Sequence, residues 1–106
     1  MITIDEFKRI EMVVGEVKNA ERVLGTEKLL KLEVDIGTET RNMVAGIAQE
    51  YSAEELIGKK IIVLKNLQPA TIRGIESNGM LLAADVKGKA VLPFFTQNVP
   101  NGAKVR

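Results

Sequence analysis

Residues 30–36 alternate between apolar and polar side chains, and this pattern limits the possible folds of the chain more than any other feature. Leu30, Leu32, Val34 and Ile36 take every second position, with charged residues between them. A period of two is the period of a β-strand that has one buried side and one solvent-facing side. The segment is therefore predicted to be a strand with one wet face.

Four further segments have the composition of strands, namely residues 10–23, 41–47, 60–67 and 79–84. The first of them is rich in β-branched residues, and Gly15 is expected to introduce a bend or a bulge there. A polar turn at 37–40 joins the alternating segment to the strand that follows it. These two strands are therefore predicted to form an antiparallel hairpin.

Two capping boxes predict short helices. In a capping box, a Ser or Thr and the Glu three residues later bond each other's backbone N–H groups, which begins a helix. The predicted helices are residues 4–9, after the box Thr3–Glu6, and residues 53–57, after the box Ser52–Glu55 and before Gly58 as the C-terminal glycine.

Five strands with a helix between the third and the fourth is the order of an oligonucleotide-binding (OB) barrel. The predicted fold class is therefore all-β, with a short N-terminal helix and a C-terminal extension added to the barrel. In an OB barrel the ligand lies on strands two and three, between two loops that correspond here to residues 21–28 and 67–78. The second loop has about a dozen residues, and connections of that length tend to bind ligands. Its Pro69, Gly74 and Gly79 are equally compatible with a connection that only reverses the chain.

With 106 residues the chain is long enough to bury a core without disulfides or metals, and one domain is expected over 1–106. A turn at 87–89 predicts a last short strand at 90–92, followed by a polar tail at 93–106. The predicted parts of the domain are an N-terminal turn at 1–9, a barrel at 10–84 and a C-terminal extension at 85–106.

The sequence contains neither cysteine nor histidine, which excludes disulfides and every zinc, haem or iron–sulfur site built on those residues. The acidic residues take no EF-hand spacing, so neither a metal nor a cofactor is expected. Ser-His-Asp and Cys-His nucleophiles cannot be built, no nucleotide-binding glycine motif occurs, and an enzyme based on a lysine or a carboxylate has no constellation to support it. No signal peptide or stretch of transmembrane length is visible, which predicts a soluble, cytoplasmic protein.

Fifteen basic and fourteen acidic residues leave a net charge of +1, so any basic patch must be assembled by folding. Lys28 and Lys31 lie near the start of the second strand, and Lys65 and Arg73 flank the long loop, so barrel closure is expected to bring four cations to one face. The alternative is that these are ordinary solvated side chains. Arg73 is the sharpest case, because a guanidinium in a glycine-bounded loop can bind a phosphate or a base edge bidentately.

The long loop also carries three short polar side chains, Asn66, Ser77 and Asn78, which suit base edges or ribose hydroxyls and are equally common in turns. Met80 beside them offers an apolar face or belongs to the core. The chain has only four aromatic residues, whereas proteins that grip single strands stack bases on aromatic side chains. An RNA ligand is therefore expected to be read by its shape, its phosphates and a few bases.

Four stretches of the sequence carry a resemblance to a known family: IDEF, AERVLGTEKLLKLEVDIG, NMVAGIAQEYSAEELIGKKIIVLKNLQP and IRGIESNGMLLAA. They resemble the tRNA-binding domain found as the C-terminal module or separate β subunit of methionyl-tRNA synthetases. Similar domains occur in free-standing structure-specific tRNA-binding proteins and in endothelial monocyte-activating polypeptide II. The resemblance extends from Ile4 to about Gly102.

This resemblance implies an OB fold that binds tRNA by its overall shape, near the outer elbow, without reading an anticodon. The RNA-binding residues that it implies are Lys28, Asn66, Ser77 and Met80, with Arg73 and Asn78 as loop neighbours. Two departures each remove a cation that the family often has, Met12-Val13 in the first strand and Gln68 before Pro69. Binding is therefore expected to rest more on Lys65 and Arg73.

Members of this length resemble homodimers that are closed by the region after the fifth strand. Pro93, Phe94 and Phe95 are then expected as apolar anchors in a twofold interface, or else as side chains that close the open end of the barrel. The function that the resemblance implies is non-catalytic tRNA binding in support of a methionyl-tRNA synthetase catalytic domain. The alternative is the chaperone-like branch of the same superfamily, which binds unfolded polypeptide and which the pattern Arg73-Gly74…Gly79-Met80 disfavours.

Overall fold

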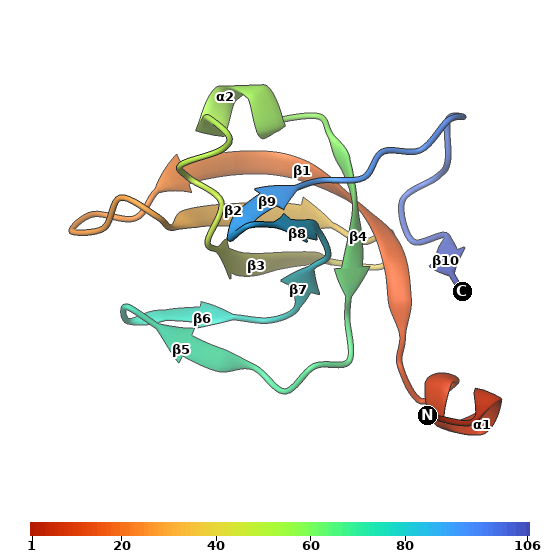
Figure 1. Ribbon diagram of the computed structural model, residues 1–106. Coiled ribbons are helices and arrows are strands. Elements are labelled where there is room, and N and C mark those ends of the chain that lie inside the picture. Colours follow the sequence, from red (N-terminus) through yellow and green to blue (C-terminus); the bar gives the residue numbers. More distant parts are fainter.

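The computed structural model describes residues 1–106, and almost all of its regular structure is β (Figure 1). Two single-turn helices, α1 (Ile4–Phe7) and α2 (Ala53–Leu56), both begin at the capping boxes expected from the sequence, although each is shorter than predicted. The ten strands are β1 (Met12–Arg22), β2 (Leu30–Asp35), β3 (Thr40–Ala45), β4 (Lys60–Leu64), β5 (Ala70–Ile72), β6 (Ile75–Ser77), β7 (Met80–Leu81), β8 (Ala84–Val86), β9 (Lys89–Val91) and β10 (Lys104–Val105).

β1 is the central strand of the main sheet, whose order is β3-β2-β1-β4-β7, with every pair antiparallel. β10 pairs with the first two residues of β1. The sheet closes where the N–H of Asn78 donates to the carbonyl of Asn42 at 2.8 Å and the N–H of Val44 donates to Ser77 Oγ at 3.0 Å. The predicted all-β fold with a five-stranded OB barrel is thereby confirmed.

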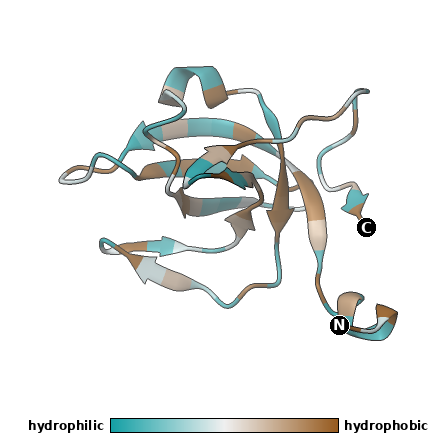
Figure 2. Cartoon of the chain, viewed as in Figure 1, coloured by the Kyte–Doolittle hydropathy of each residue, from teal (hydrophilic) through white to brown (hydrophobic).

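The core fills the barrel with aliphatic side chains from β1 to β4 and from the helix between β3 and β4. The alternation in β2 is confirmed, because Leu30, Leu32 and Val34 are fully buried while Glu33 is exposed. Figure 2 shows β4 as a predominantly hydrophobic strand, and Ile61 and Val63 point from it into the same core. Truncating a buried leucine of this kind to alanine costs about 2–5 kcal/mol.

Gly15 serves close packing, and the predicted bulge lies elsewhere in β1. A Cβ atom on Gly15 would lie 2.5 Å from Cγ1 of Val34 and 2.9 Å from Cγ2 of Val63, so only glycine lets these strands approach. The irregularity in the pairing of β1 with β2 lies instead between Val17 and Asn19. An isolated glycine in a strand marks either a bulge or a close approach, and the pattern alone did not distinguish the two.

Three predictions for the second half of the chain were wrong in detail. The loop 67–78 contains a hairpin, β5–β6, and the predicted strand 79–84 is reduced to the two residues of β7. The predicted strand 90–92 is part of a second hairpin, β8–β9, which begins at Ala84. Both hairpins turn through two residues of positive φ, Arg73-Gly74 and Lys87-Gly88. Asn-Gly is the usual signal for such a turn, so the turn at Arg73-Gly74 was not recognised, whereas at Lys87-Gly88 the turn was predicted and the strand before it was not.

The C-terminal tail folds back onto the barrel. The N–H of Gly102 donates to the carbonyl of Val14 at 2.7 Å, and the next residue accepts a bond from the N–H of Val14. Gly102 has φ +87°, and a Cβ atom there would lie 2.8 Å from the carbonyl oxygen of Ile36. The ammonium of Lys60 donates to the carbonyl of Val99 at 2.8 Å and to Oδ1 of Asn101 at 2.6 Å. The predicted polar tail is thus an ordered part of the fold.

Candidate nucleic-acid interface

One end of the barrel carries a groove that two of the predicted RNA-binding residues, Lys31 and Arg73, line. Arg22 at the end of β1, Lys31 in β2 and Arg73 at the tip of the β5–β6 hairpin all line it. Leu24 and Ile75 provide apolar surface between these cations. We call this groove the cationic groove; its lining is completed by Glu21 and Val23.

The cations of this end differ in how strongly the protein already holds them. Lys31 is 3.9 Å from the exposed carboxylate of Glu21, a separation at which an exposed ion pair contributes little. Arg22 donates from Nη2 to the carbonyl of Ala48 at 3.2 Å and keeps its other donors. Arg73 is exposed and forms no ion pair or hydrogen bond, and its guanidinium is therefore free to bind an anion.

Lys28 lies in the loop that borders the groove, and its ammonium is also exposed and unpaired. The carbonyl of Lys28 accepts a bond from the N–H of Ala48 at 3.0 Å, next to the carbonyl that Arg22 contacts. The loop 21–28 and the segment after β3 are thereby joined. Lys28, Lys31 and Arg73, three of the four predicted cations, occupy this end of the barrel.

Sequence reasoning missed Arg22 and Leu24, although both lie within the predicted binding loop 21–28. Leu24 is 94% exposed, and Arg22 aligns with Leu30 at the end of the β1–β2 ladder. The signal was available, because the last residue of a strand that enters a binding loop points toward whatever the loop binds. A leucine in a polar loop is likewise expected to be exposed, because the loop lies outside the core.

Lys65 and Asn66 are placed apart from the groove and are held by the N-terminal segment. Lys65 Nζ is 3.6 Å from the carboxylate of Glu11. The side-chain amide of Asn66 accepts from the N–H of Glu11 at 2.9 Å and donates to the carbonyl of Arg9 at 2.7 Å. Both hydrogen-bonding sides of Asn66 therefore have a partner within the protein.

Ser77, Asn78 and Met80 lie where the barrel closes. Ser77 is only 6% exposed, and its Oγ accepts from Val44 at 3.0 Å. Asn78 is half-buried and closes the barrel through its backbone N–H, and its side-chain amide forms no hydrogen bond within the chain. Met80 is 45% exposed and lines a hollow with residues of the β8–β9 hairpin. Of these three, Met80 and the Asn78 amide are accessible to a ligand.

The predicted interface residues after β9 lie on another face, beside α2. Pro93 and Phe94 line a hollow with Tyr51 and Leu92, and Phe94 is 84% exposed. The hydroxyl of Tyr51 accepts from the N–H of Leu92 at 3.0 Å, which fixes this segment, and Phe95 is half-buried. The wide exposure of a phenylalanine leaves this hollow with an uncovered apolar rim.

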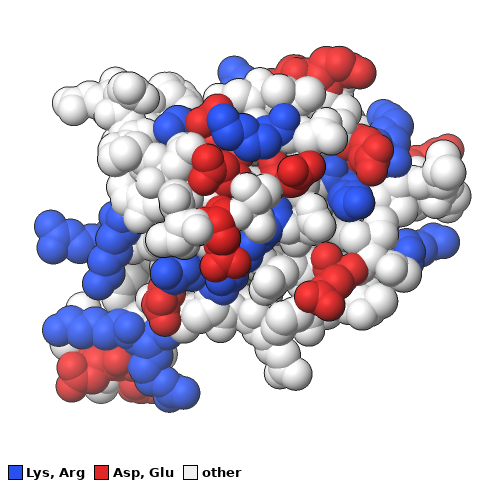
Figure 3. All heavy atoms as spheres, turned by 180° about the vertical axis from the view of Figure 1, so that it is seen from behind, with Lys and Arg blue, Asp and Glu red and all other residues white.

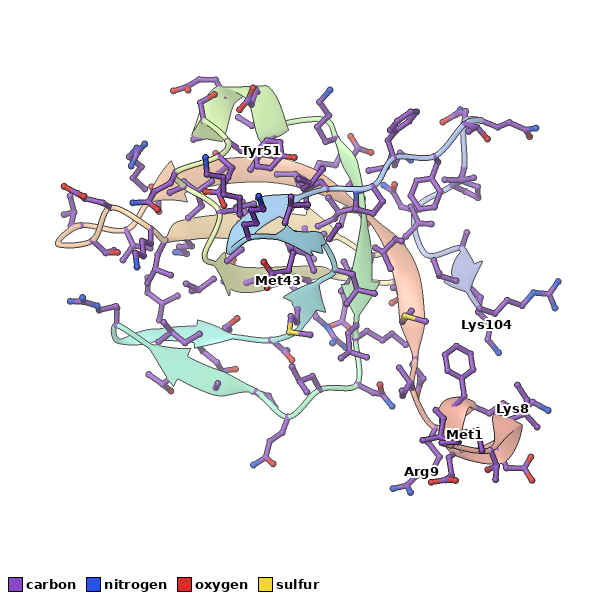
Figure 4. All side chains as sticks on the ribbon, viewed as in Figure 1. Met1, Lys8, Arg9, Met43, Tyr51 and Lys104 are labelled. Atoms are coloured by element: carbon purple, nitrogen blue, oxygen red, sulfur yellow. The ribbon has the colours of Figure 1, made fainter.

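The remaining charged surface is mixed in sign. Figure 3 shows the face seen from behind, where Lys and Arg side chains are interspersed with Asp and Glu. Figure 4 places Lys8 and Arg9, which follow α1, at the same end of the molecule as Lys104 on β10. No group of three or more acidic residues is arranged to hold a metal ion, and no helix is long and apolar enough to span a membrane.

The match to a family model covers most of the chain. The model described as "Putative tRNA binding domain" matches residues 12–104. The chain belongs to this family. The residues that this model of the tRNA-binding domain matches include the cationic groove, the long loop and the segment of Phe94.

Relatives with this domain include methionine–tRNA ligases. The ligase of Methanothrix thermoacetophila is 51% identical over 106 residues, which are 100% of this chain and 16% of that protein. The ligase of Methanosphaera stadtmanae is 58% identical over 85 residues, which are 80% of this chain and 13% of that protein. The chain thus corresponds to a small part of these relatives.

Solved structures with the same fold fall into two groups. The MetRS-related protein of Pyrococcus horikoshii superposes with a TM-score of 0.95 at 46% identity, covering 100% of this chain and 98% of that one. The chaperone CsaA of Bacillus anthracis superposes with a TM-score of 0.91 at 28% identity, covering 100% of this chain and 99% of that one. The same fold therefore occurs both in a MetRS-related protein and in a chaperone.

Proposed function

We propose that this chain binds tRNA by its shape and phosphate backbone, without reading a sequence, and that the cationic groove is the binding site. The observation that carries this proposal is the position of Arg73. Its unpaired guanidinium projects from a hairpin tip into a groove that also holds Arg22 and Lys31. A free guanidinium clustered with two weakly held cations beside apolar surface suits phosphates and the flat face of a base.

The domain is proposed to act as an accessory module or β subunit of methionyl-tRNA synthetase. Its role is to raise the affinity of the synthetase for tRNA, while catalysis resides in another domain, in the cytoplasm. The support is the identity of 51% to a methionine–tRNA ligase of which the chain matches only 16%. A module of this size increases affinity by adding a second, tethered contact.

The module is further proposed to form a homodimer through Pro93, Phe94 and Phe95. The exposed ring of Phe94 and the apolar hollow beside it are the support for this contact. Light scattering at several protein concentrations tests it, with Phe94→Ser as the variant. The expected result is a dimer for the wild type and a monomer for Phe94→Ser. A wild-type monomer at every concentration would remove this part of the proposal.

The direct test of the function is tRNA binding at several salt concentrations. The wild type is compared with Arg73→Gln and with Lys59→Gln, a control that removes one exposed lysine beside α2. Arg73→Gln is expected to reduce the slope of log K against log salt by about one phosphate contact, while the control leaves the slope unchanged. Absence of binding at the lowest salt, or equal slopes for both variants, would overturn the proposal.

A second candidate function is the binding of unfolded polypeptide. The hollow of Tyr51, Leu92 and Phe94 and the similarity to the chaperone CsaA favour it. A permanently unfolded polypeptide is the probe, titrated in parallel with tRNA. Binding of the polypeptide that Phe94→Ser abolishes, together with no binding of tRNA, would replace the first proposal by this one.

A further inference from the structure

Two residues of the chain have an unusual backbone conformation, and both are basic. Arg73 and Lys87 each have φ +53°, and they are the only non-glycine residues with positive φ. Each is the first of two turn residues and is followed by glycine, Gly74 in one hairpin and Gly88 in the other. The chain thus builds the same turn twice with a cation at each tip.

A basic residue is a poor choice for this position. The left-handed region costs free energy for any side chain with a Cβ, and Asn is the non-glycine residue that adopts it most readily. A single substitution to Asn at either tip would therefore relax the turn. Strain of this kind persists where the side chain serves a purpose other than folding.

The β8–β9 hairpin lies at the same end of the barrel as the cationic groove. Gly88 and Lys89 line a hollow together with Met80 and with Gly46, which follows β3. Two residues beyond Gly46, the backbone of Ala48 is bonded to both Arg22 and Lys28. The second hairpin is thus adjacent to the segment that holds the cations of the groove.

The acidic residues of this hairpin region are engaged by backbone groups. Oδ1 of Asp85 accepts from the N–H of Gly88 at 2.8 Å, and Oε1 of Glu50 accepts from the N–H of Ala90 at 2.8 Å. No ion pair involves Lys87 or Lys89, and both are exposed. Their ammonium groups are available to an external anion.

We propose that Lys87 and Lys89 form a second contact with the phosphate backbone of the RNA, beside Met80 and in addition to the contact of Arg73. This inference rests on the proposed tRNA-binding function and enlarges its site. The two hairpin tips would then contact one RNA.

The experiment compares two double variants of equal net charge. Lys87→Gln with Lys89→Gln removes the proposed contact, and Lys59→Gln with Lys104→Gln removes two exposed lysines from other parts of the surface. Each is titrated with tRNA at several salt concentrations. The hairpin variant is expected to reduce the slope of log K against log salt by about two relative to the control. A hairpin variant with the slope of the control would overturn the inference.

The variant Lys87→Asn is expected to change the stability of the fold and the affinity for tRNA in opposite directions. Asn-Gly is the favoured sequence for this turn, so the midpoint of thermal unfolding is expected to rise by about 2–4 °C. Affinity for tRNA is expected to fall at the same time, with a slope smaller by about one. A rise in stability with unchanged affinity would show that Lys87 makes no RNA contact.

The outcomes separate the two proposals. If the wild type binds tRNA and Arg73→Gln reduces the slope while the hairpin variants do not, the groove remains the site and the second contact is rejected. If the wild type does not bind tRNA at low salt, the proposed function itself fails.

Discussion

The two ends of β1 use the same kinds of polar residue for opposite purposes. In the half of β1 from Met12 to Glu16, which we call the Met12 end, Lys60 lies opposite Glu16, and Lys60 and Asn101 are bonded within the protein and hold the C-terminal tail. At the Arg22 end, Lys28 and Arg73 have no ionic partner and face solvent. A net charge of +1 therefore does not show that the two ends differ in how their cations are paired. Folding pairs Lys60 and Lys65 with carboxylates at one end and leaves Lys28 and Arg73 without a partner at the other.

The strongest test of this contrast compares two glycines of similar φ. Gly102 at the Met12 end has φ +87°, and Gly74 at the other end has φ +78°. A Cβ atom would lie 2.8 Å from the carbonyl oxygen of Ile36 in the first case and would have no neighbour within 4 Å in the second. Gly102→Ala is expected to cost about 2–4 kcal/mol and Gly74→Ala about 1 kcal/mol. Denaturant unfolding measures both, and equal losses would contradict a tightly packed tail.

Asn66 tests whether the Met12 end takes part in RNA binding. Asn66→Ala removes two hydrogen bonds to the N-terminal segment, from Glu11 and to Arg9, and is expected to cost about 1 kcal/mol of unfolding free energy. The salt dependence of tRNA binding is expected to stay unchanged, because no cation is lost. A large loss of affinity without a loss of stability would instead assign Asn66 to the RNA site.

Glu16 gives the Met12 end a dependence on pH. The hydrogen bond from the side chain of Asn101, and then that from Lys18, hold the pKa of Glu16 below its ordinary value of 4.5. A lowered pKa in the folded state stabilises the protein above the pKa of the unfolded chain, and this stabilisation is lost as the pH falls through the folded-state pKa. The difference in unfolding midpoint between wild type and Glu16→Gln should therefore be present at pH 7 and shrink below pH 4.5. A difference that is constant with pH would exclude the ionic role.

The smallest effect is expected from Glu21→Gln at the Arg22 end. The carboxylate of Glu21 lies 3.9 Å from Lys31 and lines the cationic groove. Its removal should raise tRNA affinity at low salt by about twofold, since an exposed pair of this kind contributes roughly 0.2–1 kcal/mol. Lower affinity after this substitution would mean that the carboxylate orients Lys31 for its ligand.

The sequence predicted those features that short patterns encode. Alternation identified β2, and the capping boxes located the start of both helices. Bonds between distant residues could not be foreseen, such as the one from the Asn101 side chain to Glu16, 85 positions away. For the same reason Lys65 was expected on one face with Lys28, Lys31 and Arg73. The structure places it beside Glu11, because pairing of β1 with β4 brings those two segments together.

The hairpins illustrate a second limit of the sequence patterns. The turn at Lys87-Gly88 was predicted, but the short, fully exposed strand β8 before it has no strand pattern, and only its first residue, Ala84, fell within a predicted strand. Residues such as Ser77 had the chemistry of a ligand contact, yet burial gives that hydroxyl a structural partner in Val44. The polar residue types therefore predicted the region of the site better than they predicted which residues face a ligand.

The pairing of β10 with the first residues of β1 has a consequence for how this domain can be joined to other polypeptides. Residues of α1 and β10 line one hollow, so the first and last segments of the chain emerge together. They do so at the end of β1 that lies farthest from Arg22. A connector attached at either terminus would therefore lead away from the hairpin tips and leave the cationic groove uncovered.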